Sequence, residues 1–110
     1  MAQRRIQGQL LLPADAAGAA RIRIELRDVS KQDMASVLLA ARDLDGITLT
    51  PGAPIGFHLD APEGSGSLQI RVQADAVSPS GAPAVYLTTQ AYPVAPTGDV
   101  QGLEVALKKA

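Results

Sequence analysis

A strict alternation of aliphatic and charged residues is the feature of this sequence that most constrains its fold. In residues 21–27 (RIRIELR), Ile22, Ile24 and Leu26 alternate with four charged residues. Successive side chains of a β-strand point to opposite faces, so this stretch would turn its aliphatic side to a core and its charged side to water. The alternation therefore predicts a half-buried antiparallel strand.

Three other stretches repeat this alternation: residues 55–59, 68–74 and 103–108. Four such stretches are hard to reconcile with helices. Three further apolar runs bring the expected strands to seven: residues 6–12, 37–42 and 85–92. Glycine and proline clusters separate them, which is typical of a sandwich or barrel. We therefore expect an all-β fold, a seven-stranded antiparallel β-sandwich of the immunoglobulin-like or transthyretin-like kind, formed by residues 1–110 as a single domain.

Residues 31–41 also fit a second interpretation, a single helix. Four apolar residues of this segment have the spacing of a helical stripe: Met34, Val37, Leu38 and Ala41. Asp28 and Ser30, however, already suit a turn before it, and the run 37–39 suits a strand covered on both faces. We favour the strand and keep the helix as the alternative.

The composition removes several classes of function. The 110-residue chain has a formal net charge of −1, which offers no strong field for nucleic acid or an anionic membrane. It has no cysteine, so the chain as given has no disulfide, thiolate metal site, cysteine nucleophile or lipid-bearing cysteine. Its only aromatic residues are Phe57, Tyr86 and Tyr92, so small aliphatic side chains must form the core.

The first residues do not have the pattern of a signal peptide. Residues 6–9 (IQGQ), which follow Arg4 and Arg5, are too polar for the apolar region of such a peptide. No run approaches the roughly 18 apolar residues that a membrane helix needs. We expect neither a signal peptide nor a transmembrane segment in the chain as given.

The single histidine, His58, gives little support to catalysis. It falls on the phase of its strand opposite Phe57 and Leu59, so we expect it to face solvent. A general base needs a nucleophile beside it, and no Gly-x-Ser-x-Gly turn is present; residues 64–67 (GSGS) suit a flexible hairpin tip. Glycine-rich nucleotide-binding motifs are also missing. We expect no catalytic residue, no cofactor and no independent enzymatic activity.

Three pairs of carboxylates could supply oxygen ligands to calcium: Asp28 with Asp33, Asp43 with Asp45, and Asp60 with Glu63. Residues 43–46 (DLDG) resemble the opening of a calcium loop, but its later ligands are missing. A turn in which aspartate bonds to nearby backbone explains them more simply. We expect no metal site, and a calcium- or carbohydrate-binding sandwich stays an alternative.

Two features could bind a partner protein. Arg21, Arg23 and Arg27 share the charged face of one strand, with Arg71 on a neighbour, and could dock an acidic segment. The apolar runs 37–39 and 85–87 could recruit a partner strand or helix to a sheet edge, and edge strands also offer a route to a homo-oligomer. The candidate partner-binding residues are Arg21, Arg23, Arg27, Val37 and Leu39.

Four segments together resemble the YscW/YbaY family of small bacterial β-sandwich lipoproteins, which includes type III secretion pilotins: residues 10–13 (LLLP), 24–36 (IELRDVSKQDMAS), 55–60 (IGFHLD) and 88–94 (TTQAYPV). The clearest marker is the turn with Asp28, Ser30 and Asp33, which we expect to connect two strands. The resemblance implies a periplasmic or outer-membrane location, although the lipid-bearing cysteine of the family is missing here.

These observations predict a non-enzymatic β-sandwich that binds a protein partner, as a lipoprotein-like or pilotin-like chaperone. A second hypothesis is a small accessory subunit that stabilises the catalytic chain of a heteromeric enzyme. Neither hypothesis involves nucleic acid.

Overall fold

The computed structural model describes residues 3–30 and 36–110, which form β-strands and no helix. The nine strands of these residues are β1 (Gln3–Leu11), β2 (Gly18–Asp28), β3 (Val37–Leu49), β4 (Ile55–Pro62), β5 (Leu68–Val77), β6 (Pro83–Leu87), β7 (Tyr92–Val94), β8 (Val100–Ala106) and β9 (Lys108–Lys109). The all-β expectation is confirmed, and the helix alternative is wrong from residue 37 onward because β3 begins there. Residues 31–35 and Asp33 lie outside the described part of the chain. Within the described residues no segment could cross a membrane as a helix.

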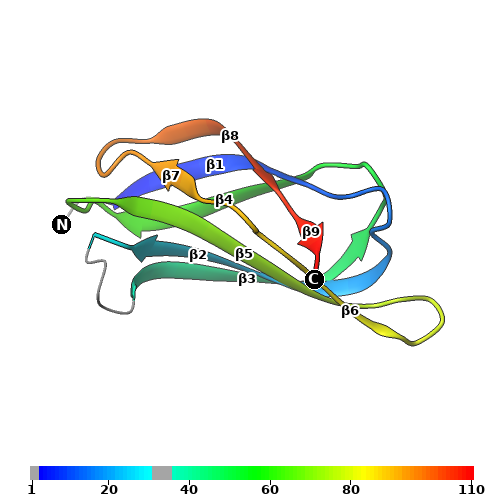
Figure 1. Ribbon diagram of the computed structural model, residues 1–110. Coiled ribbons are helices and arrows are strands. Elements are labelled where there is room, and N and C mark those ends of the chain that lie inside the picture. The colour runs from blue at the N-terminus through cyan, green and yellow to red at the C-terminus, as the bar shows by residue number, and fades with distance from the viewer. Residues whose placement is uncertain (1–2, 31–35) are drawn as a thin grey trace.

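The strands form two layers (Figure 1). One sheet has three strands in the order β4-β1-β8, and the other has the order β3-β2-β5-β6-β9, with β7 also paired to β5. The inner faces of both sheets supply one hydrophobic cluster, which makes the architecture sandwich-like. Since the strands number nine and two of them pair in parallel, neither an immunoglobulin-like nor a transthyretin-like topology is established.

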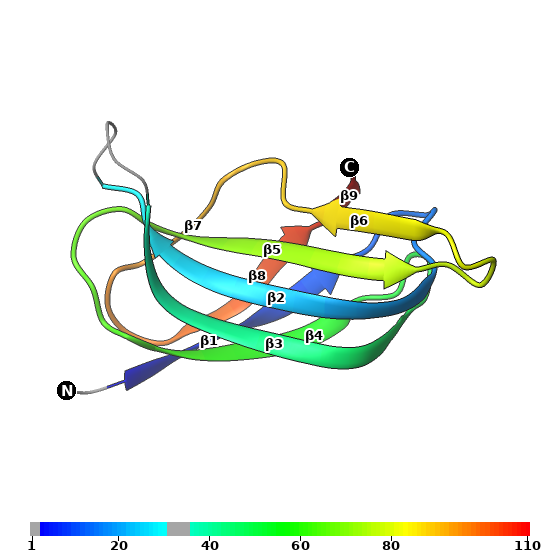
Figure 2. The same cartoon turned by 90° about the horizontal axis from the view of Figure 1, so that it is seen from below.

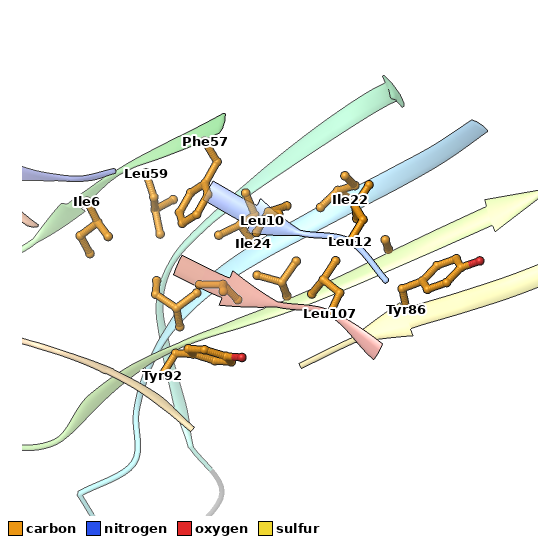
Figure 3. Packing of buried hydrophobic residues seen from close by; sticks show 14 of the residues in the cluster. Ile6, Leu10, Leu12, Ile22, Ile24, Phe57, Leu59, Tyr86, Tyr92 and Leu107 are labelled. Carbon is orange, nitrogen blue, oxygen red and sulfur yellow. The ribbon is translucent and has the colours of Figure 1, made fainter. Parts of the chain in front are cut away.

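The core follows the alternation of the sequence. Ile22, Ile24 and Leu26 of β2 are fully buried in the same cluster as Ile6 and Leu10 of β1. Figure 3 shows Ile22 and Ile24 within this cluster. Each fully buried aliphatic side chain contributes about 1.5–3 kcal/mol by leaving water. The expectation of a mainly aliphatic core is confirmed, and the three aromatic rings are buried with it: Phe57, Tyr86 and Tyr92.

The run 85–92, expected as one strand, is two strands. β6 ends at Leu87 and β7 begins at Tyr92, although both pair with β5. Residues 88–91 lie opposite only residues 71–72, so the extra residues leave the ladder. Thr88 stays attached, because its N–H donates to Val72 O (3.1 Å) and its Oγ1 accepts from Val72 N (3.4 Å).

The run 103–108 is also split, because the chain changes sheets within it. β8 pairs with β1 up to Ala106, and β9 pairs with β6 from Lys108. Leu107, between them, is buried and donates its N–H to Leu11 O (3.0 Å). One unbroken alternating stretch of sequence therefore contributes strands to both sheets.

Strands β1 and β8 are parallel, which corrects the expectation of a purely antiparallel fold. The chain arrives at β8 from β7 of the other sheet, so it is not bound to the hairpin geometry that makes neighbours antiparallel. Gly8 permits the close approach of the two strands, since a Cβ there would lie 2.1 Å from Leu103 O. The register shifts at the same place.

Two connections differ from the expected turns. Residues 64–67 are not a hairpin tip, because β4 and β5 belong to different sheets and the segment crosses between them. Residues 43–46 do not form a turn, because β3 continues through them to Leu49. Asp45 and Gly46 instead lie opposite the single residue Arg21 as a β-bulge, which Gly46 permits with φ of 66°.

Candidate partner-binding surfaces

A row of arginines lies on the outer face of the six-stranded sheet, along β2, as expected. Arg21 Nε pairs with Asp45 Oδ1 at 2.7 Å, and Arg23 Nη1 with Asp43 Oδ1 at 3.2 Å. The two aspartates that could have opened a calcium loop are therefore counter-ions of the arginine row. Among the described residues no group of three acidic or histidine side chains is placed to hold a metal ion.

Glu25 lies within this row and is its least exposed member, with a side chain 17% exposed. Arg27 Nε donates to its Oε1 at 2.9 Å, and Arg23 Nε donates to its Oε2 at 3.0 Å. The hydrogen bonds from Arg27, and then those from Arg23, hold the pKa of the Glu25 carboxyl below its ordinary value, against the opposing effect of burial. The Asp45 carboxylate likewise raises the pKa of the Arg21 guanidinium through its hydrogen bond and its charge.

A depression of about 390 Å³ opens beside this row, between β2 and β6. Arg23 and Arg27 line one side, Arg71 and Asp75 of β5 line the floor, and Leu87 and Thr88 line the other side. It lies where the chain leaves the sheet after β6, and Figure 2 shows the chain looping out before β7. The expected position of Arg71 beside the arginine row is confirmed, since its Cα is paired with that of Glu25.

The start of β3 exposes apolar side chains. Val37 is 59% exposed and Leu38 is 42% exposed, whereas Leu39 is partly buried and packs against the core. The reason is a bulge: Leu26 is opposite Ala40 and Arg27 is opposite Leu38, so Leu39 is omitted from the ladder. The sequence analysis chose Leu39 and not Leu38 as a candidate partner-binding residue, because an alternation cannot show where a bulge reverses it.

Leu38 and the arginine row belong to one continuous surface. Directly paired residues of antiparallel strands point to the same face, so Leu38 stands beside Arg27. Arg27 also lines the depression, and its Nη1 donates to Ser36 Oγ at 3.2 Å. An exposed apolar strip at the β3 edge therefore adjoins the cationic depression.

His58 does not face open solvent, which corrects the expectation from its strand phase. It is half-buried, and Arg42 Nη1 lies 2.9 Å from its Nε2 and donates to its carbonyl oxygen at 2.9 Å. A guanidinium has only donors, so Nε2 accepts and the ring proton lies on Nδ1. Arg42 comes from β3 and His58 from β4, so this contact ties the two sheets together along one edge.

The Asp28–Ser30 part of the expected turn is present, whereas Asp33 lies outside the described residues. Ser30 N–H and Ser30 Oγ both donate to Asp28 Oδ1. Ser30 Oγ also accepts from Ser67 N (2.9 Å), and Val29 N donates to Ser67 O (2.9 Å). The turn therefore holds the end of β2 against the crossing between β4 and β5, a tertiary contact that no local pattern indicates.

The comparisons support the fold and nothing finer. No protein-family model matches the chain, and no curated protein matches it significantly. A solved structure does share its fold. It is an alternative pilotin from the type II secretion system of Vibrio cholerae, with a TM-score of 0.70, 17% sequence identity, and coverage of 99% of this chain and 100% of that one. The pilotin-like part of the expected resemblance is supported at the level of fold.

Proposed function

We propose that this protein is a non-enzymatic, pilotin-like chaperone of the YscW/YbaY kind that binds a partner protein. The observation that carries the proposal is the likeness to the Vibrio cholerae pilotin, which extends over nearly the whole of both chains. The likeness therefore covers both sheets and the connections between them. The partner we assign is a secretin, a channel-forming protein of a secretion system.

The proposed docking surface is the start of the β3 edge, which we call the apolar strip: Leu38 stands beside Arg27 on the outer face, and Val37 is exposed on the other side of the same strand. Side chains this exposed and apolar are disfavoured on a strand edge unless something covers them. The edge of β3 offers backbone groups to an added strand, and the adjoining cationic depression offers charge complementarity to an acidic residue. The occupant is thus an apolar segment of the partner that also bears a carboxylate.

Capture of a purified secretin fragment tests the proposal. The double variant Val37→Asp/Leu38→Asp should lose at least about tenfold in affinity, since each buried apolar side chain contributes about 1.5–3 kcal/mol. Val77→Asp is the matched control, because Val77 is 54% exposed but lies at the end of β5 that is far from Val37 and Leu38. Equal binding by the double variant and the control would rule out this surface. Failure of the wild-type chain to bind any secretin would overturn the proposed function.

A further inference from the structure

One guanidinium in the outer depression has no carboxylate partner among the described residues. Arg71 is paired in register with Glu25, but both oxygens of Glu25 are occupied: Oε1 by Arg27 Nε and Oε2 by Arg23 Nε. Asp75, at the other end of the depression, accepts from Gln73 Nε2 (3.0 Å). With the Gln69 amide in the orientation that satisfies both groups, its oxygen accepts from Arg71 Nε (3.2 Å) and Nη2 (3.3 Å), which leaves the Nη1 side of the guanidinium for a further acceptor.

The geometry that leaves Arg71 accessible comes from the interruption between β6 and β7. A continuous strand would place outward side chains beside the residues around Val72, but residues 88–91 leave the ladder there. Thr88 hydrogen-bonds to both the N–H and the carbonyl oxygen of Val72. The backbone of Val72 therefore needs no neighbouring strand at the depression. The result is a built recess with a cation in it.

The charges around the recess select a single carboxylate. Its lining carries three arginines (Arg23, Arg27 and Arg71) and two carboxylates (Glu25 and Asp75), which leaves one positive charge. Asp43 and Asp45 stand on the next strand, and the whole chain has a net charge of −1. A polyanion such as nucleic acid or an anionic bilayer would meet these aspartates as well as Glu25 and Asp75, whereas a single carboxylate could sit beside Arg71, the arginine of the recess that pairs with no carboxylate of the described residues.

We propose that Arg71 anchors a glutamate or aspartate side chain of the partner protein, with Leu87 packing against the apolar residue next to it. This inference rests on the proposed function, because it names the chemistry of the partner segment. The planar fork of arginine matches a carboxylate with two parallel hydrogen bonds, which a lysine cannot reproduce. Arg71 would be an anchoring residue, and the strip at Val37 and Leu38 would bind the apolar remainder of the segment.

The test uses two peptides, N-acetyl-Leu-Glu-Leu-amide and its glutamine analogue, titrated to millimolar concentration into the isotope-labelled protein. Nuclear magnetic resonance would follow the Arg71 Nε–H and the Leu87 methyl groups. The glutamate peptide should shift both signals in a saturable way that weakens with added salt, and the glutamine peptide should not. Arg71→Gln should abolish the Leu87 shift, Arg71→Lys should retain only part of it, and Arg5→Gln, at an exposed arginine of the other sheet that pairs with Asp60, should leave it unchanged.

Several outcomes would overturn the anchor. The anchor is wrong if both peptides give equal shifts, if the shifts are confined to other residues, or if no shift is seen. It is also wrong if inorganic phosphate or anionic vesicles give the same response as the glutamate peptide. These outcomes leave the proposed function standing if the Val37→Asp/Leu38→Asp variant still loses secretin binding. Conversely, a positive peptide result with no secretin binding would keep the anchor chemistry and reject the secretin as partner.

Discussion

Arginines between the two sheets and arginines on the outer face obey the same alternation but meet opposite physical conditions. Arg4 of β1 is 3% exposed, and its Nη1 donates to the carbonyl oxygens of Ala95 and Gly98. Arg23 of β2 has a side chain that is 45% exposed, and it pairs with two carboxylates. Burial makes each unmade hydrogen bond costly, so we expect the contacts of Arg4 to contribute to stability. Water screens the exposed ion pairs of the outer face, so they contribute little to stability and are available for binding.

Arg4 marks the place where the chain crosses between sheets. Residues 95–99 connect β7 of one sheet to β8 of the other, and Arg4 holds two of their carbonyl groups. Gly64 N adds a bond to Pro96 O (2.8 Å), and Glu63 Oε1 accepts from Gly98 N (3.3 Å). Nε and Nη2 of Arg4 are buried and have no hydrogen-bond partner among the described residues. Holding the crossing segment in this way therefore costs free energy, because part of a buried guanidinium stays unsatisfied.

Removal of the Arg4 side chain should have the largest effect on stability. Arg4→Ala would leave the carbonyls of Ala95 and Gly98 without this donor and open a cavity where a buried side chain was, which should lower the unfolding free energy by about 2–4 kcal/mol. Arg4→Met should recover most of that loss, since it keeps the volume and buries no charge. Urea denaturation measures both. If Arg4→Ala had the same unfolding free energy as the wild type, the buried arginine would contribute no more to stability than the arginines of the outer face.

The next largest effect is expected at a neutral inter-sheet contact. Tyr92 Oη accepts from Ala106 N (3.0 Å) and donates to Ala106 O (3.3 Å), joining β7 to β8. Tyr92→Phe should cost about 1–2 kcal/mol, because two backbone groups lose their partner. Tyr86→Phe is the control, since Tyr86 Oη donates to Asp15 O alone (3.1 Å) and should cost less. Thermal unfolding followed by circular dichroism would rank them, and a reversed order would contradict the account.

The Asp28 turn should come third. Asp28→Ala removes the acceptor of two Ser30 donors and should cost about 1 kcal/mol, while Asp28→Asn keeps an acceptor and should cost less. The measurement is the urea midpoint together with partner capture. A loss of binding by Asp28→Ala at unchanged stability would instead make the turn part of the binding surface.

The smallest effect is expected for the outer ion pairs, and it should depend on pH. Because Arg27 and Arg23 lower the pKa of Glu25 in the folded state, the contribution of Glu25 to stability is fully present above its unfolded pKa of about 4.3. It disappears as the pH falls through the lower folded pKa. Glu25→Gln should therefore be less stable than the wild type by under about 1 kcal/mol at neutral pH, and the difference should vanish in acid.

Stability curves of the two proteins measured from pH 7 down to about pH 3 would test this sign. A difference between wild type and Glu25→Gln that grows toward low pH would contradict the lowered pKa. A difference above the range of ordinary surface ion pairs would show that the outer row also holds the fold together.

Much of the fold and part of the candidate site could be predicted from the sequence. The inward phase of Ile22, Ile24 and Leu26, the outward arginines and the Asp28 turn all followed from local rules. Arg4 had a detectable signal, since it shares the phase of Ile6, but only when the first strand is extended back beyond residue 6. The exposure of His58 and Leu39 could not be predicted from the alternation, because a neighbouring sheet edge covers His58 and a bulge turns Leu39 toward the core.

The sequence by itself determined that the chain is all-β, where the alternating stretches form strands and, within an unbroken strand, which face each side chain takes, because these depend on the two-residue period of the backbone. Only the tertiary structure decided that residues 85–92 are interrupted, that 103–108 change sheets, and that β1 and β8 run parallel. Such features depend on pairing between residues far apart in the chain, which local alternation leaves open. The accessible guanidinium of Arg71 follows from this pairing: the outward position is local, and the missing strand beside it is not.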